Sequence, residues 1–219
     1  MHNIFWCQLL THVARLRVFG IRTEGKRSMI PSRDNPGLIE PLHVAGGMRR
    51  LPLPEGVRGE ENISADGRYR QRLVRDWTPQ GVCPRSILWI GMNPSIADAQ
   101  DDDPTCKRER LLSVDLGYSR YLKGNVLDWR ATKPRDLPNQ INQACSPDNL
   151  PSIVEMAEEA EIVVIAHGNM HQRYVPIIDR TIEALRRVGK PLFVLGRNVT
   201  GHPKHILRMP VELNLEPFY

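Results

Sequence analysis

The chain has 219 residues, 41% of them hydrophobic, and a formal net charge of +5. This length suits one α/β domain with an extension, and the apolar content is enough to bury a core. No apolar run approaches the roughly 20 residues that span a bilayer, and the first residues lack the basic region and cleavage site of a secretory signal. We therefore expect a soluble, cytoplasmic protein without a membrane partner.

The excess of positive charge lies in the N-terminal third of the chain. Residues 1–75 contain 13 Lys or Arg against 7 Asp or Glu, which leaves the remainder with a net charge of −1. Residues 1–62 are rich in Pro, Gly and Arg, apart from an amphipathic stretch near residues 4–19 that predicts a short helix. We predict a basic, partly disordered extension over 1–62 and an α/β domain over 63–219. A basic segment favours polyanions such as DNA, and a solvated tail is the alternative.

The four cysteines are scattered, with no paired spacing typical of zinc, an iron–sulfur cluster or a redox pair. They are Cys7, Cys83, Cys106 and Cys145. We expect ordinary thiols, and we predict no cofactor.

From Ile63 onward, short apolar runs alternate with helical patterns. Residues 67–77 predict an edge strand or one half of a hairpin. Further strands are predicted over 85–92, 121–129, 161–168 and 191–196, and helices over 105–116, 147–160 and 175–189. This alternation predicts a three-layer α/β sandwich with a mostly parallel central sheet of about four strands. Ligands of such sheets bind beyond the carboxyl ends of the strands, so the loops that follow the strands are the expected site.

The loop after the first of these four strands begins with the sequence GMNPS. Gly91 permits a close backbone approach, and Pro94 holds Asn93 in an extended conformation. A side chain fixed in this way can position a water molecule or a substrate group. An Asn-Pro turn without a function is the alternative.

Several aspartates follow in the same loop, and three roles are open to them. They can cap the helix that starts near Thr105, bind Mg²⁺ through hard oxygen ligands, or face a positively charged sugar. We expect Asp103 to cap the helix, and Asp98 and Asp102 to contact substrate. No second carboxylate cluster follows in the domain, which disfavours a two-metal nuclease, so we predict no metal site.

The other three loops carry further polar residues. Taken singly, each of these residues suits a cap or a turn, but four such loops at one edge of a sheet indicate a site. The second strand supplies Asn125 and Asp128, followed by Trp129 and Arg130. The third strand gives His167, Gly168 and Asn169, and the segment after the fourth contains Arg197, His202, Lys204 and His205.

These motifs carry a family resemblance. From about Ser64 to the C-terminus, NPSIAD, DDPT, NVLDWRATKP and GHPKH match in order the pattern of the bacterial and phage family called domain of unknown function 1643. The same order of loops resembles, more remotely, the uracil-DNA glycosylase superfamily, whose first motif has an Asp or Asn before a proline and whose late motif begins HPS. The resemblance implies a uracil-DNA glycosylase-like fold.

The resemblance also implies roles for individual residues. Asn93 takes the position that orients the attacking water, Asn125 the position that reads the base edge, and His202 the position that hydrogen-bonds the departing base. We add Asp98 as a third catalytic residue. The remaining expected contacts are Gly91, Met92, Pro94, Ser95, Asp102, His167 and Gly168 with the substrate, and Lys204, His205, Arg130 and Arg197 with DNA.

The expected function is that of a DNA glycosylase, which hydrolyses the N-glycosidic bond of a flipped-out base and leaves an abasic site. Ser95 stands where uracil-specific enzymes of one branch carry a bulky tyrosine, and Lys204 replaces the serine of HPS. We therefore expect a bulky or modified pyrimidine, such as glucosylated hydroxymethylcytosine of phage DNA, and a role in phage defence. The expected partner is double-stranded DNA and the expected state is a monomer. An enzyme of free nucleotides and a catalytically inactive DNA-binding module are the alternatives.

Overall fold

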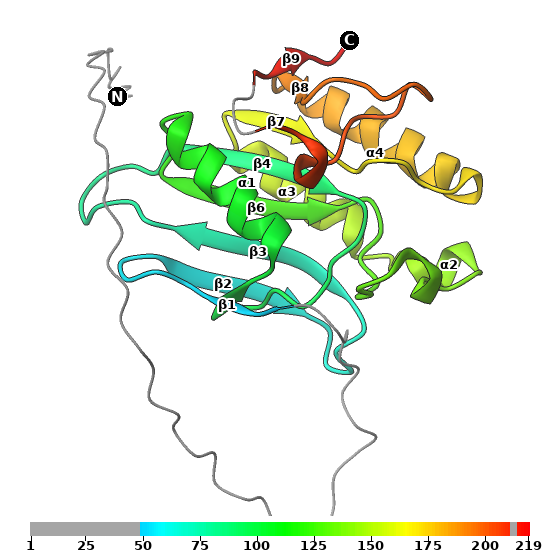
Figure 1. The fold of residues 1–219 in the computed structure, drawn as a ribbon, viewed down its shortest axis with the longest axis horizontal. Coiled ribbons are helices and arrows are strands. Elements are labelled where there is room, and N and C mark those ends of the chain that lie inside the picture. Colours follow the sequence, from blue (N-terminus) through cyan, green and yellow to red (C-terminus); the bar gives the residue numbers. More distant parts are fainter. Residues whose placement is uncertain (1–48, 211–213) are drawn as a thin grey trace, which may run out of the picture. The chain divides into compact units, whose positions relative to one another are not determined.

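The computed structural model describes residues 49–210 and 214–219 (Figure 1). The helix predicted near residues 4–19 lies outside the described residues. Within them, a seven-stranded sheet has the strand order β2-β3-β6-β4-β7-β8-β9. Its strands are β2 (Arg58–Ile63), β3 (Arg70–Asp76), β4 (Ser86–Gly91), β6 (Arg120–Asn125), β7 (Ile162–Ile165), β8 (Leu192–Val194) and β9 (Glu216–Pro217).

Four neighbouring strands at the centre of the sheet, β6, β4, β7 and β8, run parallel to one another. They correspond to the four strands predicted from the sequence. All six residues of β4 are buried, as expected for a strand covered on both faces.

The sheet as a whole is mixed, so the prediction of a mostly parallel sheet of about four strands was wrong. In this sheet, β2 pairs with β3, β3 with β6, and β8 with β9, and all three pairs are antiparallel. A separate two-stranded sheet, formed by β1 (Leu51–Pro52) and β5 (Asp101–Asp102), is also antiparallel. A short turn joins β2 to β3, and strands joined in this way must run antiparallel. β3 is thus one half of a hairpin, which was one of the two predictions for residues 67–77. It lies inside the sheet, so the other prediction, an edge strand, was wrong.

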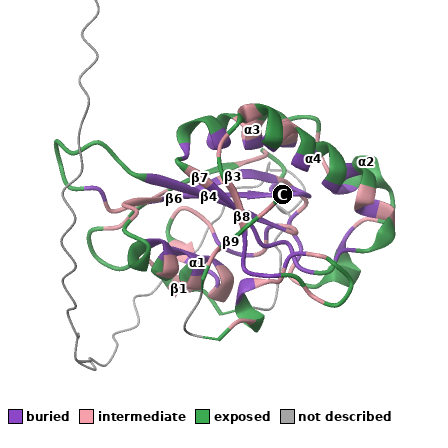
Figure 2. Ribbon diagram, turned by 90° about the horizontal axis from the view of Figure 1, so that it is seen from above, coloured by how far each residue is buried: buried purple, intermediate pink, exposed green. Residues whose placement is uncertain are grey.

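Helices cover both faces of the sheet (Figure 2). On one face α3 (Asn149–Glu159) and α4 (Val175–Val188) pack through Ile153, Met156, Ile182 and Leu185 against Leu88 and Ile165. On the other, α1 (Pro104–Asp115) and the 3-10 turn η3 (Ile206–Arg208) contribute Leu112 and Ile206 to a cluster with Ile87, Trp89 and Val164. The described residues thus form three layers of an α/β architecture. The shorter elements are α2 (Ile141–Ala144), η1 (Pro134–Asp136) and η2 (Gln172–Tyr174).

Strands β1 and β2 fall within residues 49–62, which we had assigned to the N-terminal extension. Residues 58–62 pair with β3 and are therefore part of the sheet. None of the helices in residues 49–210 and 214–219 combines the length and the apolar character needed to cross a bilayer.

Candidate functional site

A cavity of about 400 Å³ lies beyond the carboxyl ends of β4 and β6. This is the edge of the sheet at which parallel strands of α/β proteins present their ligand-binding loops. Of the residues predicted to form the site, nine line this cavity: Gly91, Met92, Asn93, Ser95, Asn125, His167, Gly168, Lys204 and His205. Six do not: Pro94, Asp98, Asp102, Arg130, Arg197 and His202.

Asn93 is held in one orientation. Its Nδ2 donates hydrogen bonds to the backbone carbonyl of Ala131 at 2.7 Å and to that of Pro94 at 3.0 Å. Both amide hydrogens are thus committed to the backbone. The group that Asn93 can offer to a ligand in the cavity is therefore Oδ1, a hydrogen-bond acceptor.

Asn125 ends β6 and is buried, with 1% of its surface exposed. Neither its Nδ2 nor its Oδ1 has a hydrogen-bond partner within residues 49–210 and 214–219. A buried amide without partners costs about 1–3 kcal/mol, so native proteins rarely contain one. At the wall of a cavity, such an amide presents one donor face and one acceptor to whatever enters.

Lys123 lies two residues before Asn125 on the same strand and also lines the cavity. Its Nζ forms an ion pair with Oε1 of Glu109 at 2.8 Å, and the hydroxyl of Tyr121 donates to Oε2 of the same carboxylate at 2.7 Å. A Cβ at Gly91 would come within 2.7 Å of this Nζ and 2.8 Å of Asn125 Oδ1. Glycine at this position therefore makes room for both polar groups.

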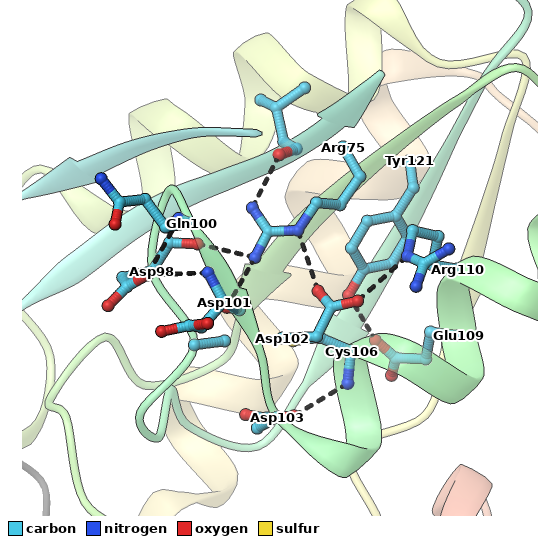
Figure 3. A network of polar contacts seen from close by, with 12 residues as sticks. Arg75, Asp98, Gln100, Asp101, Asp102, Asp103, Cys106, Glu109, Arg110 and Tyr121 are labelled. Carbon is cyan, nitrogen blue, oxygen red and sulfur yellow. Dashed lines mark hydrogen bonds and ion pairs between the residues drawn. The ribbon is translucent and has the colours of Figure 1, made fainter. Parts of the chain in front are cut away.

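Asp103 is the N-cap of α1, as the sequence predicted. Its Oδ1 accepts a hydrogen bond from the backbone N–H of Cys106 at 2.8 Å (Figure 3). Asp103 is also the only carboxylate among the described residues that line the cavity. The acidic residue that faces the cavity is thus Asp103, and not Asp98 or Asp102.

Asp98 and Asp102 instead belong to a structural network, which is drawn in Figure 3. Asp98 accepts hydrogen bonds from the backbone N–H groups of Gln100 and Asp101, both at 2.9 Å, and pairs with Arg50. These contacts close the loop on itself and lower the pKa of Asp98, even though partial burial opposes this shift. Asp98 therefore lies outside the cavity, with its oxygens engaged in holding the loop, which does not favour its predicted catalytic role.

Asp102 is fully buried between two arginines. Its Oδ1 accepts from Nε of Arg75 at 2.9 Å and its Oδ2 from Nε of Arg110 at 3.0 Å. Arg75 further donates to the backbone carbonyls of Asp98 and Asp101. This carboxylate therefore holds the loop to β3 and α1 and lies outside the cavity, which does not favour its predicted contact with substrate.

His202 lies against a neighbouring hollow and not in the main cavity. It contacts the ring of His167 edge-on, with 5.8 Å between the ring centroids. His167 lines both spaces, and its Nδ1 lies 2.7 Å from the carbonyl of Gly168. Burial lowers the pKa of His167 to about 4. His202 is thus separated from the cavity by His167, which does not favour its predicted contact with the departing base.

His205, which we had assigned to the DNA backbone, lines the cavity in its place. The backbone N–H of Leu207 donates to its Nδ1 at 3.3 Å, which leaves Nε2 as the ring nitrogen that can donate. Burial and, to a lesser degree, the charge of Lys123 lower the pKa of His205 to about 4. This imidazole is therefore neutral at neutral pH.

The other three residues outside the cavity have local contacts. Pro94 accepts a hydrogen bond from Ala131 N–H through its backbone carbonyl. Arg130 is buried and donates to the carbonyl of Gly67 at 3.0 Å. Arg197 stacks over the ring of Phe218 at 4.7 Å. None of these geometries brings the side chain to the cavity.

Three cations of the cavity, Lys123, Arg70 and Arg208, were not among the residues predicted for the site. Arg70 is buried, its Nη1 donates to the carbonyl of Ala97 at 2.7 Å, and its Nε has no hydrogen-bond partner among the described residues. A lysine in the interior of a predicted strand was the available signal for Lys123. For Arg70 the signal was weaker, because it belongs to an arginine-rich strand in which Arg75 has a structural role.

The described residues contain no group of three or more His, Cys, Asp or Glu side chains arranged to hold a metal ion. The chemistry that these side chains offer is instead that of hydrogen bonding and charge: the acceptor of Asn93, the free amide of Asn125, the carboxylate of Asp103 and the cations. This set suits a polar, planar ligand with a charged or polarised edge.

Comparison with curated proteins and with solved structures gave no match. A family model does match, over residues 68–207, which is more than half of the chain and includes both the cavity loops and the aspartate network. The chain belongs to the family described as Protein of unknown function (DUF1643).

Proposed function

We propose that this protein is a DNA glycosylase, which hydrolyses the N-glycosidic bond of a base flipped out of double-stranded DNA and leaves an abasic site. The loop order of the chain resembles that of the uracil-DNA glycosylase superfamily, and the three-layer architecture is compatible with such a fold. A base removed in this way must enter a hollow that can take one nucleotide. The cavity beyond β4 and β6 is our candidate for that hollow.

The observation that carries the proposal is the buried amide of Asn125, which has no hydrogen-bond partner in the part of the chain that the structure describes. An amide offers one acceptor and one donor side by side, which complements the hydrogen-bonding edge of a nucleobase. A ligand that pairs with both atoms recovers the free energy that the free protein loses by leaving them unsatisfied. Asn125 is thus set up to bind a base edge.

Two further side chains suit the reaction. Bond cleavage places positive charge on the sugar and negative charge on the base. Oδ1 of Asn93, fixed by its two hydrogen bonds to the backbone, can accept a hydrogen from the attacking water and orient it. The carboxylate of Asp103 faces the same cavity and can stabilise the charge that develops on the sugar.

The lining of the cavity favours a base with a polar substituent. Ser95 is small, and its hydroxyl donates to that of Thr132 at 3.3 Å. Asn169 and Asn198 add amides to the same lining. Hydroxyl and amide groups suit the hydroxyls of a sugar, so we propose a modified pyrimidine such as glucosylated hydroxymethylcytosine. Phage DNA carries such bases, which points to phage defence.

The test is incubation of the purified protein with duplexes that carry uracil, a thymine mismatch or glucosylated hydroxymethylcytosine, followed by detection of abasic sites. We expect abasic sites in the glucosylated duplex, and fewer or none in the uracil duplex. Release of uracil alone contradicts the modified-base proposal, and the absence of release from every duplex contradicts the glycosylase proposal.

Asn93→Ala separates a hydrolase from a DNA-binding module. We expect the variant to bind DNA as the wild type does and to release base about a hundredfold more slowly, because it no longer orients the water. A chain that only binds DNA would show no such loss. Free nucleotides in a parallel assay test the remaining class, since an enzyme of nucleotides would turn them over and ignore the duplex.

A further inference from the structure

The wall of the cavity next to Asn125 carries a buried cation. Lys123 is 3% exposed, and its Nζ lies within 2.7 Å of the point where a Cβ of Gly91 would be. Oδ1 of Asn125 lies within 2.8 Å of the same point. The ammonium and the amide oxygen therefore both lie beside Gly91, at the wall of the cavity. An ammonium has three hydrogens, and Glu109 is its hydrogen-bond partner among the described residues, so donors remain for a ligand.

The charges around the cavity favour an anion. Four cations line it, Arg70, Lys123, Lys204 and Arg208, against the single carboxylate of Asp103. Arg70 is 1% exposed and forms no ion pair with a carboxylate of the described residues. An unpaired buried charge is costly, and an anionic ligand beside it would offset that cost.

The two histidines of the cavity do not supply this charge. The pKa of His167 and that of His205 both lie at about 4, mainly because the rings are buried. Both imidazoles are therefore neutral at neutral pH. A positive charge beside the amide of Asn125 comes from Lys123.

We propose that the cavity wall formed by Lys123 and Asn125 is an anion site for a planar heterocyclic ring, and that its natural occupant is the departing base in its anionic form. This inference rests on the proposed glycosylase function. In that reaction the bond between the sugar carbon and the ring nitrogen breaks, and its electron pair stays on the base. The water oxygen forms the new bond to carbon, and its proton passes to solvent. Lys123 donates a hydrogen bond to the base anion, which takes up a proton from solvent after release.

The site can be tested without turnover by calorimetric titration of the full chain at pH 7 with two free pyrimidines. Barbiturate is an anion at this pH, and uracil, a ring of nearly the same size, is neutral. We expect barbiturate to bind at least about tenfold more tightly, since a charged hydrogen bond is stronger than a neutral one. Equal affinity for the two rings overturns the proposal.

Variants assign the preference to the cation. The double variant Lys123→Met, Glu109→Gln removes both charges of the pair and leaves no unpaired carboxylate, and we expect it to lose the preference for barbiturate. Glu109→Gln alone keeps the cation and should keep the preference. Arg85→Met, which breaks the exposed pair of Arg85 with Glu161 at the amino end of β4, is the matched control and should bind as the wild type does.

A third probe distinguishes the ring from other anions. If inorganic phosphate displaces barbiturate at equal concentration, the site recognises phosphate and the proposal is overturned. If a thermal melt shows that the double variant is not folded, the comparison of barbiturate with uracil in the wild type still tests the proposal. The titration tests only binding at the anion site, whereas the DNA assay tests base release. A failure of the first can therefore be told apart from a failure of the second.

Discussion

Two polar regions adjoin the carboxyl end of β4, and they differ in how their buried groups are satisfied. In the aspartate network of residues 98–103, Asp102 is bonded to Arg75 and Arg110, and Asp98 to backbone N–H groups and Arg50. In the cavity, the amide of Asn125 has no hydrogen-bond partner among the described residues. The first arrangement stabilises a loop, whereas the second lowers stability, and we propose that it leaves the amide free for a ligand.

The contrast shows that density of polar residues does not identify a site. The run of aspartates is the more conspicuous feature of the sequence, yet only Asp103 reaches the cavity. The two regions differ in whether their buried polar groups have hydrogen-bond or ion-pair partners. In the aspartate network these partners come from distant parts of the chain. The following predictions test that distinction, beginning with the largest effect.

Asp102→Ala should destabilise the protein by about 3–5 kcal/mol. The substitution leaves Arg75, which is fully buried, and Arg110 without their carboxylate, and breaking a buried pair from one side has costs of this size. Unfolding in urea, followed by circular dichroism, measures the change. A loss below about 1 kcal/mol would show that the network is not a structural one.

Acid should lower the free energy of unfolding of the protein, because the buried His167 resists protonation. Its pKa in the folded protein is about 4, below the usual 6.5, so between these values the unfolded chain binds more protons than the folded one. Stability is therefore complete above about pH 6.5 and falls as the pH drops toward 4, by about 2 kcal/mol at pH 5.

His167→Gln supplies the control, because glutamine does not titrate in this range. Urea unfolding at pH 7 and pH 5 should show a smaller decline for the variant than for the wild type, by about the same 2 kcal/mol. Equal declines would mean that the buried imidazole does not resist protonation.

Asp103→Ala should cost about 1 kcal/mol, since it removes the side-chain cap of α1. Asp103→Asn keeps the cap and loses the charge, so its stability should stay close to that of the wild type while base release falls. Thermal melts and the abasic-site assay give the two readouts. If both variants lose activity only in proportion to their stability, Asp103 is a cap and nothing more.

Asp98→Asn should have the smallest effect, below about 1 kcal/mol. Asparagine can still accept the two backbone hydrogen bonds of the loop, and only the partly exposed pair with Arg50 is lost. Base release should not change. A large drop in release at unchanged stability would restore Asp98 as a catalytic candidate.

Much of the central fold could be predicted from sequence because β4, β7 and β8 are short apolar runs and α3 and α4 have helical periodicity. β2 was missed because its residues are mostly exposed and carry no apolar alternation. β9 has two residues and is defined only by pairing with β8. Both missed strands are antiparallel additions, which changed the sheet from mostly parallel to mixed.

Part of the site could also be predicted, because the predicted strands fix where the loops at the edge of the sheet begin. Asn93 and Ser95 lie in the loop after β4, and Asn125 is the last residue of β6, so the strand positions place them at the cavity. His202 and His205 lie three residues apart in an irregular loop, and spacing alone does not tell which ring turns inward. Nor can adjacent aspartates be told apart before Arg75 and Arg110 are known to meet Asp102.

The most direct test of the account is Asn125→Leu, assayed for both base release and stability. Leucine has nearly the shape of asparagine and no polar atoms, so it removes the unsatisfied groups. The account predicts that release from the best DNA substrate falls by a hundredfold or more while the free energy of unfolding stays equal or rises. Unchanged release, or a release that declines only because the variant unfolds, would contradict the claim that this amide is kept free for a base.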